Sequence, residues 1–475
     1  MPVRVAHPAV LGILLICQFS NCLGKEVPES NQSGNYMANG IKIGEVDQDS
    51  AIIWTRLTKH KDRNMNGLAF TGDADAVPEG HILDDMEGSV PGIAGEVCVV
   101  YWPEGSENKA RSTSWEAADT HADFTRQFKL SGLNAGTTYQ LKVQARTTEA
   151  AEPSCTMSGS FKTAHDPAVS APVLFTVVTC QDYPRRDDPQ NGHKIYSVMG
   201  KIRPDFLVHT GDIEYYDKAL PYAKSQELAR FKWNRIYAMP FQRVFHRWTT
   251  SYFMKDDHDT LKDDCWPGQT YGQLTWEQGL AVFREQVPMG QKTYRTIRWG
   301  RDLQIWLVEG RDYRSPNKMP DGPEKTIWGK QQKQWFFDTV KKSDATFRIL
   351  ISPTPLVGPD RANKNDNHSN KGFTHEGNEL REFVGTQKNM CVINGDRHWQ
   401  YVSVDPKTGV REYGCGPSSD SHAGGYDMSM KTPMHRYLRI KGGFLAVSVE
   451  RVNGKPTITF RHYGPDGRIY NEDKW

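Results

Sequence analysis

The sequence predicts a mixed α/β protein in which an antiparallel β-sandwich precedes a larger domain of alternating strands and helices. Strands with alternating apolar and polar residues fill the first third of the chain. Beyond residue 170, short apolar runs alternate with stretches of helical periodicity, which is typical of α/β domains. Several of these runs end in acidic residues, histidine or cysteine, so candidate functional groups gather where strands end.

Length and composition narrow the classes of protein that fit. A chain of 475 residues accommodates two or three domains. Its 59 basic and 57 acidic residues leave a formal net charge of +2, and no long basic run occurs. We therefore expect no nucleic-acid-binding patch. No apolar stretch reaches the length of a membrane-spanning helix, so we also expect no transmembrane segment.

Residues 1–24 have the features of an export signal peptide. Arg4 gives a positive start, residues 9–17 are apolar, and small or polar residues follow through Gly24. This segment predicts a protein that is exported to the periplasm or the extracellular space. Cys22 stands in a poor context for lipid attachment, so we do not expect a lipoprotein anchor.

Six cysteines lie outside that signal. Their wide spacing matches neither a dense disulfide framework nor paired zinc knuckles. One or two disulfides would suit an oxidising compartment, but the spacing does not predict which residues pair. The six are Cys98, Cys155, Cys180, Cys265, Cys391 and Cys415.

Residues 25–165 are expected to form the N-terminal β-sandwich domain. Four stretches alternate in the way that strands of an antiparallel sandwich do. They are residues 51–57, 96–101, 124–130 and 138–145.

Residues 171–475 are expected to form the α/β domain. Apolar runs predict strands at residues 173–178, 206–208, 251–254, 303–308, 347–351 and 390–393. Helical stretches lie between them, at residues 193–201, 224–236, 276–286 and 329–342. An Asn453-Gly454 turn predicts a final β-hairpin of residues 444–452 and 457–462.

Four stretches place possible metal ligands directly after predicted strands. Each alone is a common turn, but four at corresponding positions of one sheet would converge on a single edge. A multi-metal site needs this convergence of oxygen and nitrogen ligands, with one carboxylate able to bridge two ions. The stretches are Cys180-Gln181-Asp182-Tyr183, Gly211-Asp212-Ile213-Glu214-Tyr215, Asp256-Asp257-His258-Asp259 and Asn394-Gly395-Asp396-Arg397-His398.

The order of these motifs resembles the PhoD-like alkaline phosphatases of the metallophosphoesterase superfamily. Further stretches similar to that family are Glu309-Gly310-Arg311-Asp312-Tyr313-Arg314, the Gly329, Gln332 and Trp335 pattern, and Trp54-Thr55-Arg56-Leu57. The resemblance covers nearly the whole chain beyond residue 24. It implies a four-layer α/β/β/α metallophosphoesterase sandwich preceded by a fibronectin-like β-sandwich domain.

The resemblance implies an iron site formed by Cys180, Asp212 and Tyr215. These residues match the iron ligands of the family, and Asp212 matches the carboxylate that bridges two ions. Phenolate and thiolate suit a trivalent iron. Tyr216 is the alternative to Tyr215, because adjacent residues at a strand end point in opposite directions and only one can serve. The Asp-to-Tyr spacing of the resembled motif favours Tyr215.

Four further residues complete the implied site. Asp257, Asp396 and His398 match metal ligands, although the superfamily has Asn at the position of Asp257. His258 matches the catalytic histidine. The implied cofactors are Fe³⁺ and Ca²⁺, one iron with one or two calcium ions, because a mostly carboxylate shell suits calcium. Other divalent ions also fit this donor set.

The implied reaction is direct hydrolysis of phosphate mono- or diesters, which are small molecules or borne on polymers. Two or more ions about 3.5–4 Å apart would hold a hydroxide that attacks phosphorus in line. His258 would protonate the leaving oxygen or stabilise the transition state. Arg311 and Arg314 are candidates for clamping the phosphate through their guanidinium groups, and a structural ion pair is the alternative for each.

The sequence departs from the family pattern in three places. Glu309 replaces an Asp, and the usual twin-arginine export signal is absent. Residues 363–378 match no part of the family pattern. The first two departures leave the site intact, and the third leaves the choice of substrate open.

Two other functions fit parts of the same sequence. Cys180 and Arg186 have the Cys-x5-Arg spacing of thiol-dependent phosphatases, but Asp182 would repel phosphate there and Pro184 has no N–H to offer. A non-catalytic exported binding or adhesion protein on a degenerate hydrolase scaffold is the other alternative. A degenerate site should have lost some ligands, and every matched residue is present.

Overall fold

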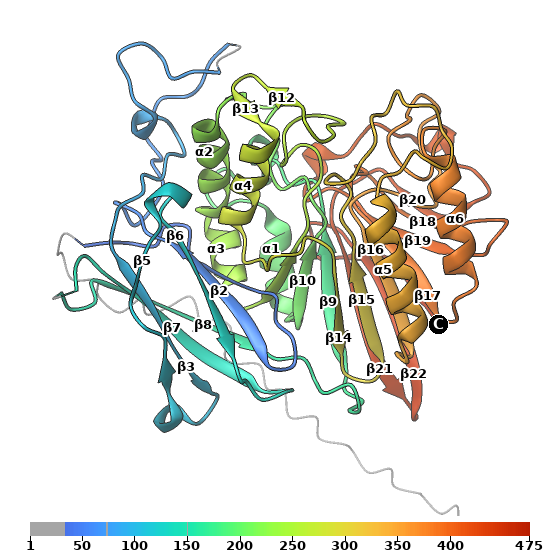
Figure 1. The fold of residues 1–475 in the computed structure, drawn as a ribbon, viewed down its shortest axis with the longest axis horizontal. Helices are drawn as coiled ribbons and strands as arrows, with labels where there is room; N and C mark the ends of the chain where they lie inside the picture. Colours follow the sequence, from blue (N-terminus) through green and yellow to red (C-terminus); the bar gives the residue numbers. More distant parts are fainter. Residues whose placement is uncertain (1–33, 73–74, 150) are drawn as a thin grey trace, which may run out of the picture. The chain divides into compact units, whose positions relative to one another are not determined.

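The computed structural model describes residues 34–72, 75–149 and 151–475. The predicted signal peptide, with Cys22, lies outside this range. The described residues contain a nine-stranded, a seven-stranded and a five-stranded sheet. They also contain a short hairpin of β12 (Thr270–Tyr271) and β13 (Leu274–Thr275). Figure 1 shows the strands of the two larger sheets with helices along their outer sides.

The nine-stranded sheet has four parallel strands at its centre, β9, β10, β11 and β1. All four residues of β10 are buried, as expected of a strand that is covered on both faces. Across the sheet, the strands are β23 (Ile469–Lys474), β22 (Lys455–Tyr463), β21 (Phe444–Val452), β9 (Val173–Val178), β10 (Phe206–His209), β11 (Thr250–Phe253), β1 (Ile41–Gly44), β2 (Ser50–Arg56) and β6 (Thr125–Ser131).

The seven-stranded sheet is also parallel in its middle part, which is formed by β15, β16, β17 and β19. Antiparallel strands extend it on both sides. Across the sheet, the strands are β14 (Arg295–Trp299), β15 (Leu303–Leu307), β16 (Phe347–Ser352), β17 (Met390–Asn394), β19 (Arg411–Cys415), β18 (Gln400–Val404) and β20 (His435–Arg439).

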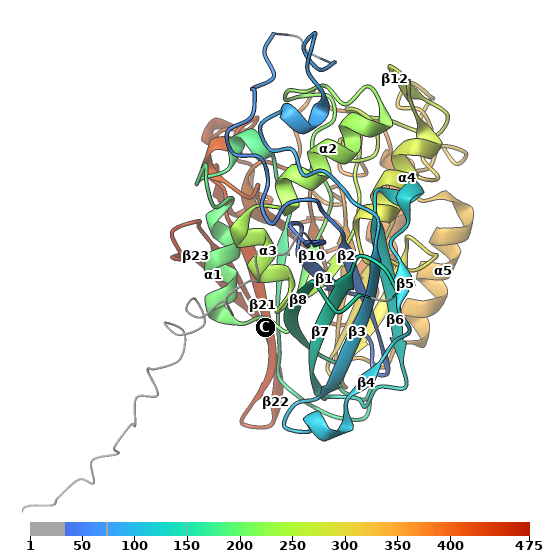
Figure 2. The same ribbon diagram turned by 90° about the vertical axis from the view of Figure 1, so that its left-hand side faces the viewer.

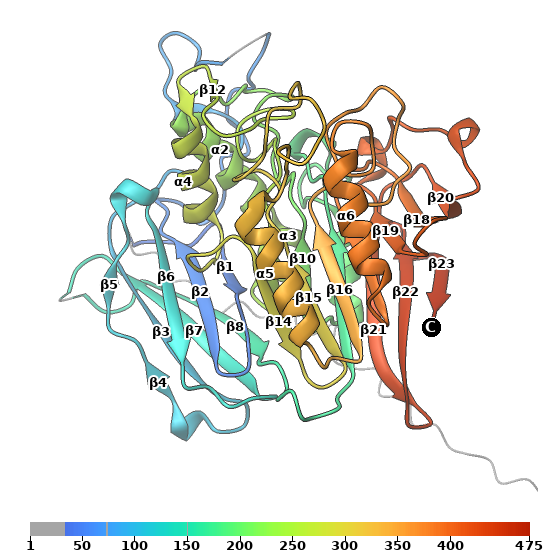
Figure 3. The ribbon, with the colours of Figure 1, turned by 45° about the vertical axis from the view of Figure 1, so that its right-hand side comes forward.

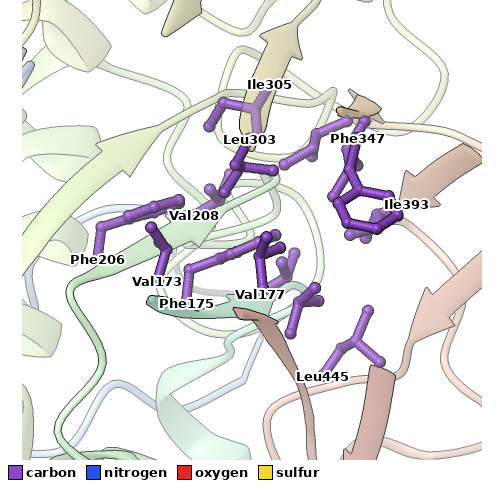
Figure 4. Packing of buried hydrophobic residues seen from close by; sticks show 14 of the residues in the cluster. Val173, Phe175, Val177, Phe206, Val208, Leu303, Ile305, Phe347, Ile393 and Leu445 are labelled. Carbon is purple, nitrogen blue, oxygen red and sulfur yellow. The ribbon is translucent and has the colours of Figure 1, made fainter. Parts of the chain in front are cut away.

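The two larger sheets pack face to face through apolar side chains. Figure 4 shows Phe175 and Val208 of the nine-stranded sheet in one cluster with Leu303 of the seven-stranded sheet, and all three are buried. Phe206 stacks on Phe175 and on Trp299, with ring centroids 4.7 and 4.9 Å apart. This close-packed layer fixes the loops at the ends of both sets of strands relative to one another.

Helices cover the outer face of each large sheet, which gives four layers in the order α/β/β/α (Figures 1 and 3). Buried residues of α1 and α3 pack on the nine-stranded sheet, and those of α5 and α6 pack on the seven-stranded sheet. The predicted four-layer α/β architecture is therefore confirmed. The helices are α1 (Lys194–Ile202), α2 (Gln226–Tyr237), α3 (Pro240–His246), α4 (Trp276–Gln286), α5 (Gly329–Lys342) and α6 (Thr374–Gly385).

The N-terminal β-sandwich shares one of its layers with the nine-stranded sheet. Strands β1, β2 and β6 pack against the five-stranded sheet (Figure 2). β1 also pairs in parallel with β11, where Ile43 lies opposite Thr250. The predicted sandwich is therefore present and is joined to the α/β part by backbone hydrogen bonds, and boundaries at residues 165 and 171 stay predictions. Its second sheet consists of β3 (Glu96–Pro103), β4 (Arg111–Ser112), β5 (Glu116–Ala117), β7 (Thr138–Arg146) and β8 (Cys155–Lys162).

The six cysteines outside the predicted signal peptide all lie within the described residues, and no disulfide joins any two of them. The disulfides that the composition allowed are therefore not formed within the part of the chain that the structure describes. Among the helices of the described residues, none has the length and apolar content that crossing a membrane requires.

Candidate metal centre

Loops that follow strands of both large sheets meet at one edge and form the candidate site. Cys180 lies in the loop after β9, Asp212 after β10, Asp257 after β11 and Asp396 after β17. Parallel strands bring their carboxyl ends to a common edge, where ligands collect. Asp212 belongs to three groups whose ligand atoms lie within 4.8 Å of one another: one with Cys180 and His398, and two with further carboxylates.

The backbone at these loops adopts an uncommon conformation. Cys180, Asp212 and Asp396 have φ values of 51°, 54° and 63°, in the left-handed region. Such a conformation costs about 1–3 kcal/mol at a residue with a side chain, and it concentrates at functional sites. Gly211 lies beside Asp212 with a φ of 109°, and a Cβ there would stand 2.6 Å from the backbone nitrogen of Asp256. The loops after β10 and β11 therefore approach each other closely.

Asp212 is the centre of the first group. Its Oδ2 accepts hydrogen bonds from the Tyr215 hydroxyl at 3.1 Å and from the Cys180 thiol at 3.5 Å. The Tyr215 hydroxyl also lies 3.2 Å from Nε2 of His398. Tyr216 points away, because its hydroxyl accepts a hydrogen bond from Trp233 Nε1 at 2.6 Å within an apolar cluster. The structure thus brings Tyr215, and not Tyr216, to the other predicted ligands.

A second set of carboxylates surrounds the same aspartate. Asp257 and His258 form one group with Asp212, and Asp256 and Asp396 form another. Asp212 Oδ1 and Asp256 Oδ2 are buried and have no hydrogen-bond partner within the described residues. A buried carboxylate oxygen without a partner is costly unless a cation or a donor meets it. The donor set of carboxylates, thiol, phenol and imidazole therefore fits a site for metal ions.

The electrostatics of the described groups also favour a cation. Burial raises the pKa of Asp212 well above its ordinary value; nearby His258 opposes this shift, and Asp257 and Asp256 add to it. Burial and then Asp212 raise the pKa of Tyr215 and of Cys180. Asp212, Tyr215 and Cys180 resist ionisation together, because a negative charge on one of them makes ionisation of the others less favourable. A bound cation would offset this repulsion.

His258 is held by a carboxylate that the sequence analysis did not assign. Its Nδ1 lies 2.6 Å from Asp217 Oδ1, and its Nε2 lies 3.4 Å from Asp263 Oδ1. Burial lowers the pKa of His258, but Asp257, Asp212 and Asp217 outweigh burial and raise it well above the ordinary value. These carboxylates favour the protonated imidazole, and Asp217 fixes its orientation.

His398 and His422 form a neutral pair on the other side of Tyr215. Their rings lie 4.1 Å apart, and Nδ1 of His422 lies 3.0 Å from the carbonyl oxygen of Cys180. Burial and then nearby His258 lower the pKa of His398 to about 3. Neutral imidazole is the form that binds metal ions.

The two arginines proposed as phosphate clamps are buried in structural interactions. Nε of Arg311 donates to Asp256 Oδ1 at 2.5 Å, and its Nη2 lies 3.6 Å from Asp257 Oδ1. Nη2 of Arg314 donates to Asn317 Oδ1 at 2.6 Å. Neither arginine is on the wall of the cavity described next. These contacts support a structural ion pair, and not a phosphate clamp, for Arg311. Neither arginine has a side chain exposed in the cavity where a substrate would contact it.

A cavity of about 310 Å³ opens over this cluster. Asp212, Asp396, Tyr215, His258 and His398 are on its wall. Basic side chains complete it: Arg185 and Lys218 from the loops after β9 and β10, and Arg361 and Lys364 from the connection between β16 and α6. The cavity therefore combines metal-ligand side chains with cations suited to an anionic ligand.

Sequence reasoning missed several residues of the site. Asp256 adjoins the predicted Asp257, and the structure places a carboxylate oxygen of each within 4.8 Å of Asp212. Asp217 ends the Asp212 motif, but its contact with His258 spans 41 residues. No signal in the sequence pointed to His422.

Comparison with known proteins identifies the family. The family described as PhoD-like phosphatase matches residues 175–438, and its N-terminal domain matches residues 23–165. The chain is 21% identical to alkaline phosphatase D of Bacillus subtilis over 458 residues, which are 83% of this chain and 71% of that protein.

Solved structures with a similar fold agree with this. The structure of PhoD has a TM-score of 0.70 at 16% identity, covering 94% of this chain and 90% of that one. Purple acid phosphatase PPD1 from seeds of yellow lupin (Lupinus luteus) has a TM-score of 0.62 at 11% identity, covering 91% of this chain and 73% of that one. The chain therefore belongs to the PhoD-like phosphatase family, and it is a phosphoric ester hydrolase.

Proposed function

We propose that the chain is an exported phosphoesterase that hydrolyses phosphate monoesters, diesters or both at a centre of one ferric iron and one or two calcium ions. The observation that carries this proposal is the position of Asp212. Its carboxylate is common to all three groups of candidate metal ligands, as a bridging ligand must be. Export rests on the sequence of residues 1–24 alone.

The donor atoms suggest how two kinds of ion would be held. Cys180 and Tyr215, with His398 beside them, supply the thiolate, phenolate and imidazole that suit iron. Asp257 and Asp396 supply carboxylates for calcium, and Asp256 is a further candidate that the structure adds. When bound, such ions neutralise charge on the phosphoryl oxygens and activate water for direct attack on phosphorus.

Protonation of the leaving oxygen is the step that a side chain of the protein performs. An ester bond to phosphorus breaks easily only if the departing oxygen receives a proton or an equivalent positive charge. His258 lines the cavity, and Asp217 holds its Nδ1, which leaves Nε2, 3.4 Å from Asp263 Oδ1, as the nitrogen that can donate to a substrate. We therefore assign His258 as the proton donor to the leaving oxygen and Asp217 as the residue that positions it.

A thiol-dependent mechanism has little support from the geometry. Arg186, which would hold the phosphate in a Cys-x5-Arg loop, donates instead to the carbonyl oxygens of Tyr183 at 2.7 Å and Pro189 at 3.0 Å. Burial and nearby Asp212 raise the pKa of Cys180, whereas a nucleophilic thiol needs a lowered one.

Assays of the purified protein on matched mono- and diester substrates, with elemental analysis, test the proposed function. We expect hydrolysis together with bound iron and calcium. Protein that carries both ions and hydrolyses neither class of ester would contradict the proposal.

Replacing Tyr215 with Phe tests the iron assignment. A phenolate or thiolate bound to ferric iron absorbs visible light, so the protein is expected to be coloured. Tyr215→Phe should shift or bleach the absorption band and lower the iron content. Tyr216→Phe is the matched control and should change neither, because that hydroxyl accepts a hydrogen bond from Trp233 in an apolar cluster. An unchanged spectrum and full iron content in Tyr215→Phe would remove Tyr215 from the site.

A further inference from the structure

The segment that matched no part of the family pattern contributes to the cavity wall. These residues, 363–378, span the end of the connection between β16 and α6, which we call the 353–373 loop, and the beginning of α6. Two basic residues of the loop, Arg361 and Lys364, line the cavity beside Asp396 and His398. Lys364 thus brings residues 363–378 into the cavity wall, and Arg361 lies just before that stretch.

A buried arginine anchors this loop to the candidate metal centre. Nη2 of Arg397 lies 2.7 Å from Asp360 Oδ2 and 3.4 Å from Asp366 Oδ2, and both aspartates belong to the loop. The same nitrogen lies 2.9 Å from Asp396 Oδ2. The two acidic side chains of the loop thus hold Arg397, and each also accepts a hydrogen bond from an asparagine of the same loop.

Arg361 and Lys364 themselves form only long ion pairs with carboxylates. The nearest carboxylate oxygen to Arg361 Nε is 3.5 Å away, on Asp360, and this nitrogen is buried with no hydrogen bond in the described structure. The nearest carboxylate oxygens to Lys364 Nζ are 3.7 Å away on Asp366 and 4.0 Å away on Asp264. About a quarter of each side chain remains exposed, 26% and 25%. Both cations are therefore available to an anion in the cavity.

We propose that Arg361 and Lys364 form a second anion site, which binds a phosphate group of the substrate other than the one that is hydrolysed. This inference rests on the proposed function and specifies its substrate class: esters that carry a further phosphate. The scissile phosphate would occupy the ligand cluster around Asp212. A cavity of about 310 Å³ has the size of sites for whole small-molecule ligands, so it accommodates more than that one group. Guanidinium and ammonium groups are the usual protein partners of phosphate.

Two substrates and four variants test this second site. One substrate is phenyl phosphate, and the other is the same ester with a non-hydrolysable phosphonate on the phenyl ring. Lys364→Gln and Arg361→Gln are each expected to raise KM for the phosphonate-bearing ester about tenfold, and to change KM for phenyl phosphate less than twofold. Lys364→Arg keeps the charge and should restore the low KM. Lys371→Gln is the matched control, because Lys371 is an exposed residue of the same loop that does not line the cavity.

The outcomes separate this proposal from the function on which it rests. Equal losses on both substrates would overturn it, because the two cations would then hold the scissile phosphate. Unchanged KM values in both Gln variants would overturn it as well. A wild-type protein that hydrolyses neither substrate would contradict the proposed function and the second site together. Unfolding midpoints of all variants should match the wild type, so that the change in KM reports binding.

The same anion could belong to a small molecule or to a polymer joined by phosphodiester bonds. Phosphodiester oligomers of increasing length, each ending in a phosphomonoester, distinguish these sources. If Lys364→Gln raises KM by the same factor for all oligomers with two or more phosphates, the substrate is a small molecule. If the factor grows with the length of the oligomer, the substrate is a polymer. If Lys364→Gln leaves KM unchanged for oligomers of every length, the second site would be overturned.

Discussion

Asp212→Asn is expected to remove most of the bound metal and to lower phosphoester hydrolysis by about 10³-fold. Asp212 is the only residue shared by all three candidate ligand groups among the described residues, so its loss weakens every ion at once. A thousandfold effect corresponds to about 4 kcal/mol of transition-state stabilisation, which is within the contribution of metal ions to charge neutralisation. Elemental analysis and the initial rates of the purified variant measure both effects.

Asp205→Asn is the matched control for this variant. Asp205 precedes the same strand, β10, at the opposite end, where its carboxylate accepts a hydrogen bond from the backbone of Leu174 at 2.9 Å. The control should retain metal and activity even if it unfolds at a lower temperature. Full metal content in Asp212→Asn, with activity equal to that of the control, would show that Asp212 bridges no ions.

His258→Ala is expected to retain metal and to lose turnover on alkyl phosphates by about 10²–10⁴-fold. The proposed role of His258 is to protonate the leaving oxygen, and an alkoxide needs that proton far more than a nitrophenolate does. Turnover of p-nitrophenyl phosphate should therefore fall much less. Rates on a series of esters whose leaving groups differ in pKa, measured for wild type and variant, give this dependence directly.

Asp217→Asn should lose turnover with the same dependence on the leaving-group pKa as His258→Ala, but by a smaller factor. Asp217 touches His258 at 2.6 Å and acts on the reaction only through it. A uniform loss on all leaving groups in His258→Ala would rule out proton donation. Loss of metal from His258→Ala as severe as from Asp212→Asn would make His258 a ligand instead.

The strands and helices that carry the site were predictable because their sequence patterns are local. Predicted helices at residues 276–286 and 329–342 coincide with α4 and α5, and the strand at residues 173–178 coincides with β9. α6 was missed, because Gly377 and Asn378 are weak helix formers. Gly377 is required there by packing, since a Cβ would lie 2.2 Å from the carbonyl oxygen of His368.

The parts of the site that escaped prediction depend on contacts between distant segments. Asp217 reaches His258 across 41 residues, and Nδ1 of His422 reaches the carbonyl of Cys180 across 242 residues. Arg311 lies in a recognisable motif, but the sequence does not indicate that its buried guanidinium donates to Asp256. Periodicity and motif order identify which strand ends bear ligands, whereas the direction of each side chain follows from tertiary packing.

Removal of metal ions from the purified full chain tests the central claim most directly. The measurement is phosphoester hydrolysis before and after exhaustive chelation, with iron and calcium determined in the same samples. We expect chelation to abolish hydrolysis, and added calcium to restore at least part of it where iron remains bound. Metal-free protein that hydrolyses the ester at the full rate would contradict the assignment of Asp212 and its neighbours as a catalytic metal centre.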